Sequence, residues 1–486
     1  MATAQNIITD RFRYYNSTNF FNAISLGKEY IYFFLARCNA WDNSDNPYIP
    51  IMKDSHQLQL QSWDEVLAIS RLLPGDCFRV IQSEGTKMVD STETAWNTVW
   101  ESGTIYDQYD DSVSMKNKNF YIISGQKVYK CLSNNGGAPS TIMPSDNYQS
   151  QDTGIIQSSD NYIWKYMYQI PSQWNRWNLS GWAPVMDIQK KSDNPSQWDI
   201  MNNVVDGGIY SFRYLDGFNV SDNLDVTLIG NGSGFKGRTL NNVITIPDEL
   251  GYSPGVGYNK VTKIQVNGSD LDKIEAIISP FGGHGFNAVR ELNGHFVAVG
   301  SDFNSSVIPY ETLFQDNNYR KIGIMSDVIR KVTSKGHENY VDRLVDDEID
   351  RGERMSRMVG DNRVQIFISV VVGNTATGLS DILENQEDLK ITQGTARGIL
   401  VNITDSDIHI IADNYPLEFT KDGGDIYVTD STGDSAGQII IDTSKDFVEE
   451  DCIRYSGNVL YAENLTEKRF RSGDTQVDKA KLVLEF

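Results

Sequence analysis

One histidine of this chain stands in a setting in which it could do chemistry. His284 lies in the run Gly282-Gly-His-Gly285, and a glycine-rich loop can present an imidazole as a ligand or as a base. A single histidine forms neither a metal site nor a catalytic dyad. The sequence therefore favours a structural role for His284.

A glycine motif is the second candidate. Residues Gly232-Ser-Gly-Phe-Lys-Gly237 match G-x-G-x-x-G, which binds dinucleotide phosphates when a helix starts at the motif. The residues that follow, 238–243, have the character of an extended chain, and no strand–helix–strand unit surrounds them. We interpret the motif as a glycine-rich hairpin.

Acidic clusters and thiols complete the candidates. Carboxylates gather at Asp107–Asp111 and Asp346–Asp350 without the spacing of a calcium loop, so both predict solvated acidic faces. The cysteines form no C-x-x-C pair, and we expect free buried thiols at Cys38, Cys77, Cys131 and Cys452. We nominate no catalytic residue, no metal ligand and no cofactor, and expect no enzymatic activity. The 65 acidic residues leave open a converging carboxylate pair of the glycosidase kind.

Composition bounds the class of protein. The chain has 486 residues, of which 40% are hydrophobic, and this predicts about two to four globular domains. Its net charge of −22 and its lack of a basic patch predict neither nucleic acid nor membrane as a partner. The N-terminus shows no secretory signal, and the longest apolar run, Tyr30–Ala36, is too short to span a bilayer. We expect synthesis in a reducing cytoplasm.

Strands dominate the predicted elements, so the predicted fold class is mainly β. The clearest helix is predicted from Trp63 to Leu73, because Ser62 and Glu65 have capping-box spacing and Pro74-Gly75 follows. A second helix is predicted over the charged stretch 342–357. The predicted strands are at about 30–37, 127–132, 162–170, 226–229, 243–246, 261–266, 319–325, 364–372 and 479–486.

The strand at 162–170 has an unusual aromatic content. Because successive side chains point to opposite faces, one face should carry four rings, those of Tyr162, Trp164, Tyr166 and Tyr168. Such a face needs a partner surface, which would be the inside of a sandwich or a subunit seam. Stacking on sugar rings is the alternative.

Several blocks of the sequence resemble one known family. Lys127-Val-Tyr-Lys-Cys-Leu132 and Asp160-Asn-Tyr-Ile-Trp-Lys-Tyr-Met-Tyr-Gln-Ile-Pro171 look like the VYRCL and DGYVWEYLFEIP segments of the baseplate wedge subunit encoded by gene eight of T-even-type contractile-tailed phages. Tyr319–Met325 and the block 456–464, with Tyr461, resemble two further segments, and residues 479–486 resemble the C-terminus. Arg37 and Trp41 follow an aromatic strand as Arg and Trp do in the family.

The resemblance implies a fold and a role. It implies a multidomain β-sandwich core with small helical elements and inserted small β domains. The expected division is a core at 1–187 with the helix at about 63–73, an inserted or expanded β domain at 188–315, a return strand at 316–330, a second inserted region at 331–449 and C-terminal core strands at 450–486.

The implied function is structural. The protein would be a homodimer in the virion tail baseplate, where it scaffolds wedge assembly with other wedge proteins and transmits baseplate rearrangement to sheath contraction. A carbohydrate-binding or glycan-hydrolysing tail-associated β protein is the alternative function. Packing or interface residues would be Tyr162, Trp164, Tyr166, Tyr168, Arg37, Trp41 and Tyr461.

Overall fold

The computed structural model is mainly β and multidomain, as predicted, with 47% strand and 11% helix. It describes residues 8–37, 66–89, 92–144, 153–247, 251–304, 318–328, 331–334, 337–341, 363–364, 368–374, 389–403, 407–412, 419–430, 433–447, 450, 452, 455–470 and 477–486.

The chain forms two compact units, each assembled from segments that are far apart in sequence. Unit 1 comprises residues 1–21, 78–298 and 483–486, and unit 2 comprises residues 22–77 and 299–482. The division falls within α1 (Asp10–Ser25) and within three strands introduced below, β3, β19 and β31. The finer five-part division expected from the sequence stays a prediction.

An antiparallel sheet in unit 1 contains the aromatic strand. Its order is β6-β7-β9-β8, with β6 at Tyr121–Ser124, β7 at Lys127–Ser133, β8 at Ile155–Gln157 and β9 at Ile163–Gln169. Every residue of β9 except the last is buried. This central strand therefore has apolar packing on both faces.

Two further sheets and three short helices contain residues of unit 1. The ribbon β4-β5 pairs Glu84–Val89 with Thr92–Asn97. The second sheet has the order β10-β3-β19-β31, with bounds Trp182–Val185, Cys77–Gln82, Phe296–Asn304 and Val477–Glu485. The short helices of unit 1 are η2 (Ser172–Trp177), α3 (Pro195–Asn202) and α4 (Ala288–Glu291), and η1 (Pro74–Asp76) belongs to unit 2.

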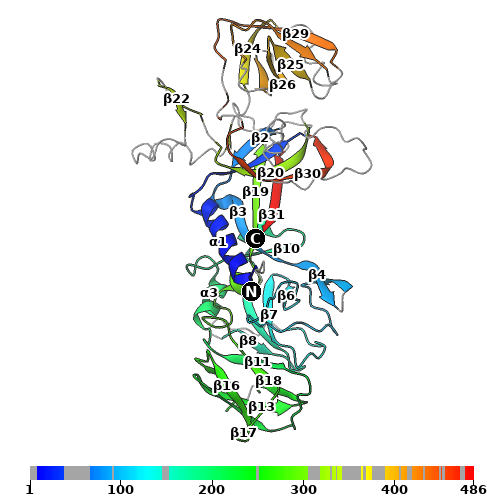
Figure 1. Cartoon of the computed structure of the whole chain (residues 1–486), viewed down its shortest axis with the longest axis vertical. Helices are drawn as coiled ribbons and strands as arrows, with labels where there is room; N and C mark the ends of the chain where they lie inside the picture. The colour runs from blue at the N-terminus through cyan, green and yellow to red at the C-terminus, as the bar shows by residue number, and fades with distance from the viewer. Residues whose placement is uncertain are drawn as a thin grey trace, which may run out of the picture. The chain divides into compact units, whose positions relative to one another are not determined.

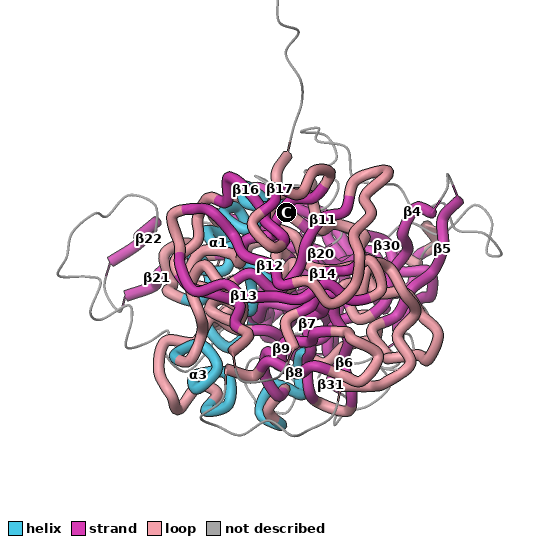
Figure 2. Tube along the Cα trace, turned by 90° about the horizontal axis from the view of Figure 1, so that it is seen from below, coloured by secondary structure: helices cyan, strands magenta, loops and turns pink. Residues whose placement is uncertain are grey.

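Residues 209–278 of unit 1 form two small sheets around a shared apolar cluster that includes Phe212, Phe235 and Ile264. One sheet pairs β11 (Ile209–Tyr214) with β18 (Ile274–Ile278). The other has the order β14-β13-β12-β16-β17; its strands β13, β16 and β17 are labelled in Figure 1, and β12 is labelled beside β13 in Figure 2. Its bounds are β12 Asp225–Gly230, β13 Ser233–Leu240, β14 Val243–Thr245, β16 Val261–Val266 and β17 Ser269–Asp270, and β15 (Ser253–Val256) pairs with β13.

The glycine motif at 232–237 lies in a hairpin, as predicted. The strand β12 ends at Gly230 and β13 begins at Ser233, so the motif spans the turn and the second strand. No helix starts there, and the residues offer no helix N-terminus for a phosphate.

Unit 2 contains an antiparallel sheet whose central strand is fully buried. The order is β23-β2-β1-β20-β30, with bounds Arg363–Val364, Val66–Arg71, Ile31–Ala36, Asn318–Ser326 and Asn458–Phe470. In β1 the side chains of Phe33, Phe34 and Leu35 are all inaccessible to solvent. The predicted strands at 30–37 and 319–325 are thereby confirmed.

A closed barrel is the second component of unit 2. Its order is β24-β27-β26-β25-β28-β29, and its own core includes Ile391, Leu400 and Val428. Closure pairs every strand on both sides and leaves no free edge. The bounds are β24 Ile368–Asn374, β25 Lys390–Gln393, β26 Ala396–Ile403, β27 Asp407–Ala412, β28 Ile426–Thr429 and β29 Ser435–Ile441, and a separate hairpin pairs β21 (Lys331–Ser334) with β22 (His337–Val341).

The helix predicted at 63–73 is wrong in the part that the structure describes. Val66–Arg71 is the strand β2, buried throughout and paired with β1 on one side and β23 on the other. The apolar residues Val66, Leu67 and Ile69 fit a helix stripe and a buried strand equally well, and here the pairing with β1 decides. Conversely, the helix α1 lies in a segment that gave no clear sequence signal. The helix predicted at 342–357 lies outside the described residues.

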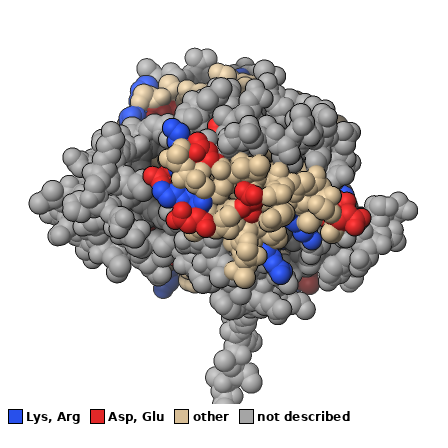
Figure 3. All heavy atoms as spheres, turned by 90° about the horizontal axis from the view of Figure 1, so that it is seen from above, with Lys and Arg blue, Asp and Glu red and all other residues tan. Residues whose placement is uncertain are grey.

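Charges of both signs are mixed on the molecular surface. On the face drawn in Figure 3, the described Lys and Arg side chains lie beside Asp and Glu side chains. The described part of that face therefore presents no continuous basic patch to a phosphate backbone.

Candidate functional site

Four ionisable side chains meet in the interior of unit 1, and we call them the buried charge cluster. They are Lys130 on β7, Lys165 on β9, His284 in the loop before α4 and Glu291 at the end of α4. None is more than 5% exposed. Charged groups in such a place are costly unless they are paired or neutralised.

The two lysines are direct cross-strand neighbours. In the register of β7 and β9, Lys130 lies opposite Lys165. Like charges at such positions repel one another, so the site needs either an anion or the loss of a proton. The site has both an anion and a lysine whose pKa is lowered.

Glu291 supplies the anion. Its carboxylate accepts a hydrogen bond from the Lys130 ammonium, and it also accepts from the backbone amides of Gly285 at 2.8 Å and Asn287 at 3.0 Å. Asn287 caps α4, because its side chain accepts from Arg290 N at 2.8 Å. The Lys130 ammonium also lies 4.1 Å from the centre of the Tyr109 ring, a cation–π contact. One carboxylate thus holds the glycine loop, the helix and a strand together.

His284 is neutral in this environment. Burial, followed by the charges of Lys130 and Lys165, holds its pKa well below the usual value. Its Nδ1 lies 3.0 Å from Lys130 Nζ, which can only donate, so Nδ1 is the acceptor and the proton is on Nε2. Tyr109 and Tyr210 approach the imidazole edge to face. The structural interpretation of His284 therefore agrees with its contacts.

Lys165 reduces the repulsion by losing its proton. Burial, opposed by the charge of Glu291 and helped to a smaller extent by that of Lys130, lowers its pKa to about 7. Its Nζ donates to the carbonyl oxygen of Thr153. A Cβ on Gly285 would lie 2.6 Å from Lys165 Cε, so glycine is required where this loop crosses the lysine.

A lysine that loses its proton near neutrality is, in chemical terms, a nucleophile or a base. Such chemistry requires that a substrate reach the amine. Lys165 is 1% exposed, and the two pockets described below are lined by other residues. The cluster as it stands joins four chain segments and presents no reactive atom to solvent.

The titration of Lys165 should make stability depend on pH. The unfolded chain keeps this proton up to about pH 10.4, whereas the folded chain releases it near pH 7. In that interval the unfolded state binds more protons, so the free energy of unfolding should rise with pH, by up to about 1.4 kcal/mol per pH unit. Urea unfolding of the Lys165→Met variant should lack this slope, while the exposed control Lys263→Met should keep it. Equal slopes in both variants would contradict the assignment.

The aromatic strand lies where the sequence predicts, and its rings are core residues. Tyr162, Trp164 and Tyr166 share a cluster with Tyr106 and Tyr129. Trp164 has no solvent exposure, stacks on Tyr162 at 5.7 Å and meets Tyr106 edge to face at 5.3 Å. Rings buried in this way cannot stack on a sugar.

The predicted face of four rings is wrong at Tyr168. The register shifts between Val128 and Tyr129, where two steps along β9 match one step along β7, so the alternation is broken at Met167. Tyr168 therefore packs with Phe120 and Trp174 in a different cluster, and its hydroxyl donates to Pro184 O at 2.8 Å. A bulge of this kind cannot be predicted from the alternation of residue types.

The remaining predicted residues are dispersed. Arg37 follows β1 and is half-buried, and Trp41 lies outside the described residues. Tyr461 is half-buried on β30, where burial raises its pKa to about 12 and its hydroxyl donates to Glu463 at 2.8 Å. Arg37 and Tyr461 belong to unit 2, whereas the aromatic strand belongs to unit 1.

The acidic cluster at 107–111 is only partly a solvated face. Asp110 is buried and ion-paired with Arg213 of β11, which lies far along the chain. Burial raises the pKa of Asp111, which is half-buried. The cluster at 346–350 lies outside the described residues. The expected thiols Cys77, Cys131 and Cys452 are free and buried, and Cys38 is not among the described residues.

Sequence reasoning missed three members of the cluster, Lys130, Lys165 and Glu291. Two lysines stood inside segments otherwise predicted to be buried strands, and this mismatch was the available signal. Glu291 gave none, because its ion-pair partner Lys130 lies 161 positions away in the sequence. Only the pairing of β7 with β9 identifies the lysines as neighbours.

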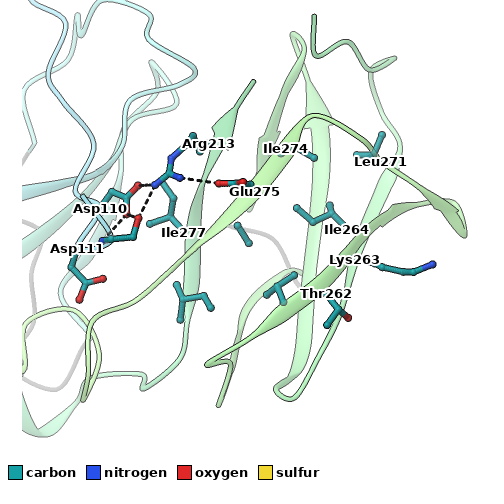
Figure 4. A pocket seen from close by; sticks show the side chains of 14 residues that line it. Asp110, Asp111, Arg213, Thr262, Lys263, Ile264, Leu271, Ile274, Glu275 and Ile277 are labelled. Atoms are coloured by element: carbon teal, nitrogen blue, oxygen red, sulfur yellow. Dashed lines mark hydrogen bonds and ion pairs between the residues drawn. The ribbon is translucent and has the colours of Figure 1, made fainter. Parts of the chain in front are cut away.

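Two open pockets occur among the described residues. One, with a volume of about 650 Å³, is bordered by β16 and β18 and has Arg213 between Asp110 and Glu275 at one end (Figure 4). The other, of about 730 Å³, is lined by polar residues such as Ser83 and Asn97 and by apolar residues such as Trp100 and Met143. No group of His, Cys, Asp and Glu side chains that could hold a metal is present in the described ranges. None of the described helices has the length and apolar character needed to cross a membrane.

Comparisons with known proteins give no family. No family model matches the chain, and no curated protein sequence matches it. Function is therefore argued from the residues themselves.

Proposed function

We propose that this chain is a structural subunit of a phage tail baseplate wedge. In this role it forms a homodimer, binds other wedge proteins in the virion and passes the baseplate rearrangement on to the contracting sheath. Its contribution is mechanical, a set of rigid β units that fix the positions of neighbouring subunits.

The proposal rests on the structural role of residues 160–171, the block that most strongly resembles the wedge family. Asp160 organises the turn before β9, where its carboxylate accepts from the backbone amides of Thr141 at 2.7 Å and Ile142 at 2.9 Å. The rings of the strand fill the core, and Pro171 is the N-cap of η2. These residues serve the folding of the chain. Proteins that share a scaffold would have such residues in common, whereas proteins that share a reaction would have catalytic residues in common.

The buried charge cluster supports the same proposal. It ties two strands, a glycine loop and a helix to one carboxylate, and its amines are sealed from solvent. Such an arrangement favours one rigid conformation of unit 1, which suits a part that transmits force.

Co-assembly tests the proposal. The purified chain is mixed with the other wedge proteins of the same phage and analysed by size-exclusion chromatography with light scattering. We expect a dimer of the chain alone and a larger, stable complex in the mixture. An unrelated acidic protein of similar charge serves as the control, because it separates specific assembly from non-specific attraction to basic partners.

Two results would contradict the proposal. One is a stable monomer that associates with none of the wedge proteins. The other is cleavage of host polysaccharide by the purified chain, which would instead favour the glycan-hydrolysing alternative.

A further inference from the structure

The pocket of Figure 4 is lined by runs of consecutive residues. Five successive residues of β18, Ile274–Ile278, and four of β16, Val261–Ile264, border it. Because side chains alternate between the faces of a strand, a pocket over one face would be lined by every second residue. Consecutive lining residues mean that the pocket runs along the edges of both strands.

One edge of β18 has no strand partner among the described residues. The strand pairs with β11 alone. Leu215 N donates to Lys273 O at 2.9 Å and Ser279 N donates to Gly208 O at 3.2 Å, so the odd-numbered residues face β11. The amides and carbonyls of Ile274, Ala276 and Ile278 therefore point the other way, toward the pocket.

The opposite wall is the edge of β16. This strand pairs with β12 along its length, but β17 covers its other side only at Gln265 and Val266. Leu271 N donates to Ile264 O at 2.8 Å, and beyond this bond the two arms of the hairpin diverge. The pocket thus occupies the place where a strand between β16 and β18 would lie.

The lining is apolar between the strands and charged at one end. Six apolar residues on the two arms pack against the cluster behind them, namely Val261, Ile264, Leu271, Ile274, Ala276 and Ile278. In Figure 4 the charged groups Asp110, Asp111, Arg213 and Glu275 lie together at one end, and Lys263 points away. Lys263 is itself paired with Asp270.

Three acids, Asp110, Asp111 and Glu275, and one base, Arg213, line the charged end. Arg213 is paired with Asp110 and with Glu275, the latter at 2.8 Å. Asp111 lies 3.8 Å from Arg290 Nη2, and the charges of Arg11 and Lys130 also act on it. A cation at this end would be attracted by Asp111. The net charge of −22 on the chain likewise favours a basic partner.

We propose that this groove binds an extended segment of a partner protein by strand addition, and that the segment carries apolar side chains at alternate positions and a lysine or arginine at the end that meets Asp111. Its backbone would pair with the free amides and carbonyls of β18, and its apolar side chains would cover the exposed part of the cluster between the two sheets. The inference is independent of the assembly to which the chain belongs.

A displayed library of random heptapeptides, panned on the full chain, tests this. We expect enriched peptides with alternating apolar residues and one terminal Lys or Arg. A peptide so selected is then titrated by calorimetry against variants of the chain. Ala276→Pro removes one groove-facing amide but leaves the bonds to β11, so it should weaken binding about tenfold or more. Ala276→Ser keeps the amide and is the matched control.

The charged end has its own test. Asp111→Asn should weaken the selected peptide about fivefold or more, and it should leave unchanged a peptide in which norleucine replaces the cationic residue. If Ala276→Pro fails to fold, N-methylation of alternate peptide amides probes the same hydrogen bonds on the intact protein and should give the same loss.

Three outcomes would overturn the proposal. They are the absence of an alternating pattern among the selected peptides, unchanged binding by both Ala276→Pro and the methylated peptide, and a dimer in sedimentation that Ala276→Pro dissociates. The last result would mean that a second copy of the chain covers the edge.

Discussion

Replacement of Glu291 by alanine is expected to lower the free energy of unfolding of unit 1 by about 3–5 kcal/mol. The reason is the position of Lys130, which is fully buried and has this carboxylate as its ion-pair partner. Removal of the anion leaves a buried ammonium beside a second lysine, and it also deprives the amides of Gly285 and Asn287 of their acceptor. Urea unfolding followed by tryptophan fluorescence measures the loss.

Two matched variants separate charge from hydrogen bonding at this position. Glu291→Gln keeps an oxygen for the two amides and loses only the charge, so its loss should be smaller. The double variant Lys130→Met with Glu291→Gln removes both charges and should regain most of the stability, because a buried ion pair exchanged for neutral groups of similar size is often neutral or stabilising. A double variant as unstable as Glu291→Ala would show that the charges are not the cause.

The strands of this protein were predictable where residue types alternate or where β-branched and aromatic residues gather. The aromatic strand at 162–170 and the run at 261–266 are examples, and both form the strands β9 and β16. The helix expected at 63–73 failed because Val66–Arg71 is buried on every side. Its apolar residues suit either a helix or a buried strand, and the pairing with β1 decides between the two.

The buried charge cluster could not be predicted in the same way. Its geometry depends on the cross-strand pairing of Lys130 with Lys165 and on a glycine loop that arrives from residues 282–285. His284 was recognised for its flanking glycines, yet its low pKa follows first from burial and then from the charges of two lysines that are far away in the sequence. The spacing of residues along the chain predicts none of these contacts. It does not predict the bulge that turns Tyr168 to the other face either.

Trp164→Ala is the second change with a large expected effect, a loss of about 3–5 kcal/mol in the free energy of unfolding. The ring is fully buried and packs against Tyr162 and Tyr106 at centroid distances of 5.7 and 5.3 Å. Its truncation leaves a cavity in the middle of a sheet that is covered on both faces, where the surroundings have little freedom to collapse. Chemical unfolding, followed by circular dichroism, measures the change.

Trp164→Phe and Phe281→Ala are the controls. The first keeps a ring at the buried position, and the second removes a ring from an exposed position. The indole Nε1 of Trp164 is buried with no hydrogen-bond acceptor among the described residues, so phenylalanine removes an unsatisfied donor and should cost much less than alanine. Phe281 is 78% exposed, and its replacement should change stability by at most about 0.5 kcal/mol. A well-folded Trp164→Ala protein that had lost only the binding of a ligand would contradict the role given to the aromatic strand, because a ring that serves the core cannot be removed without loss of stability.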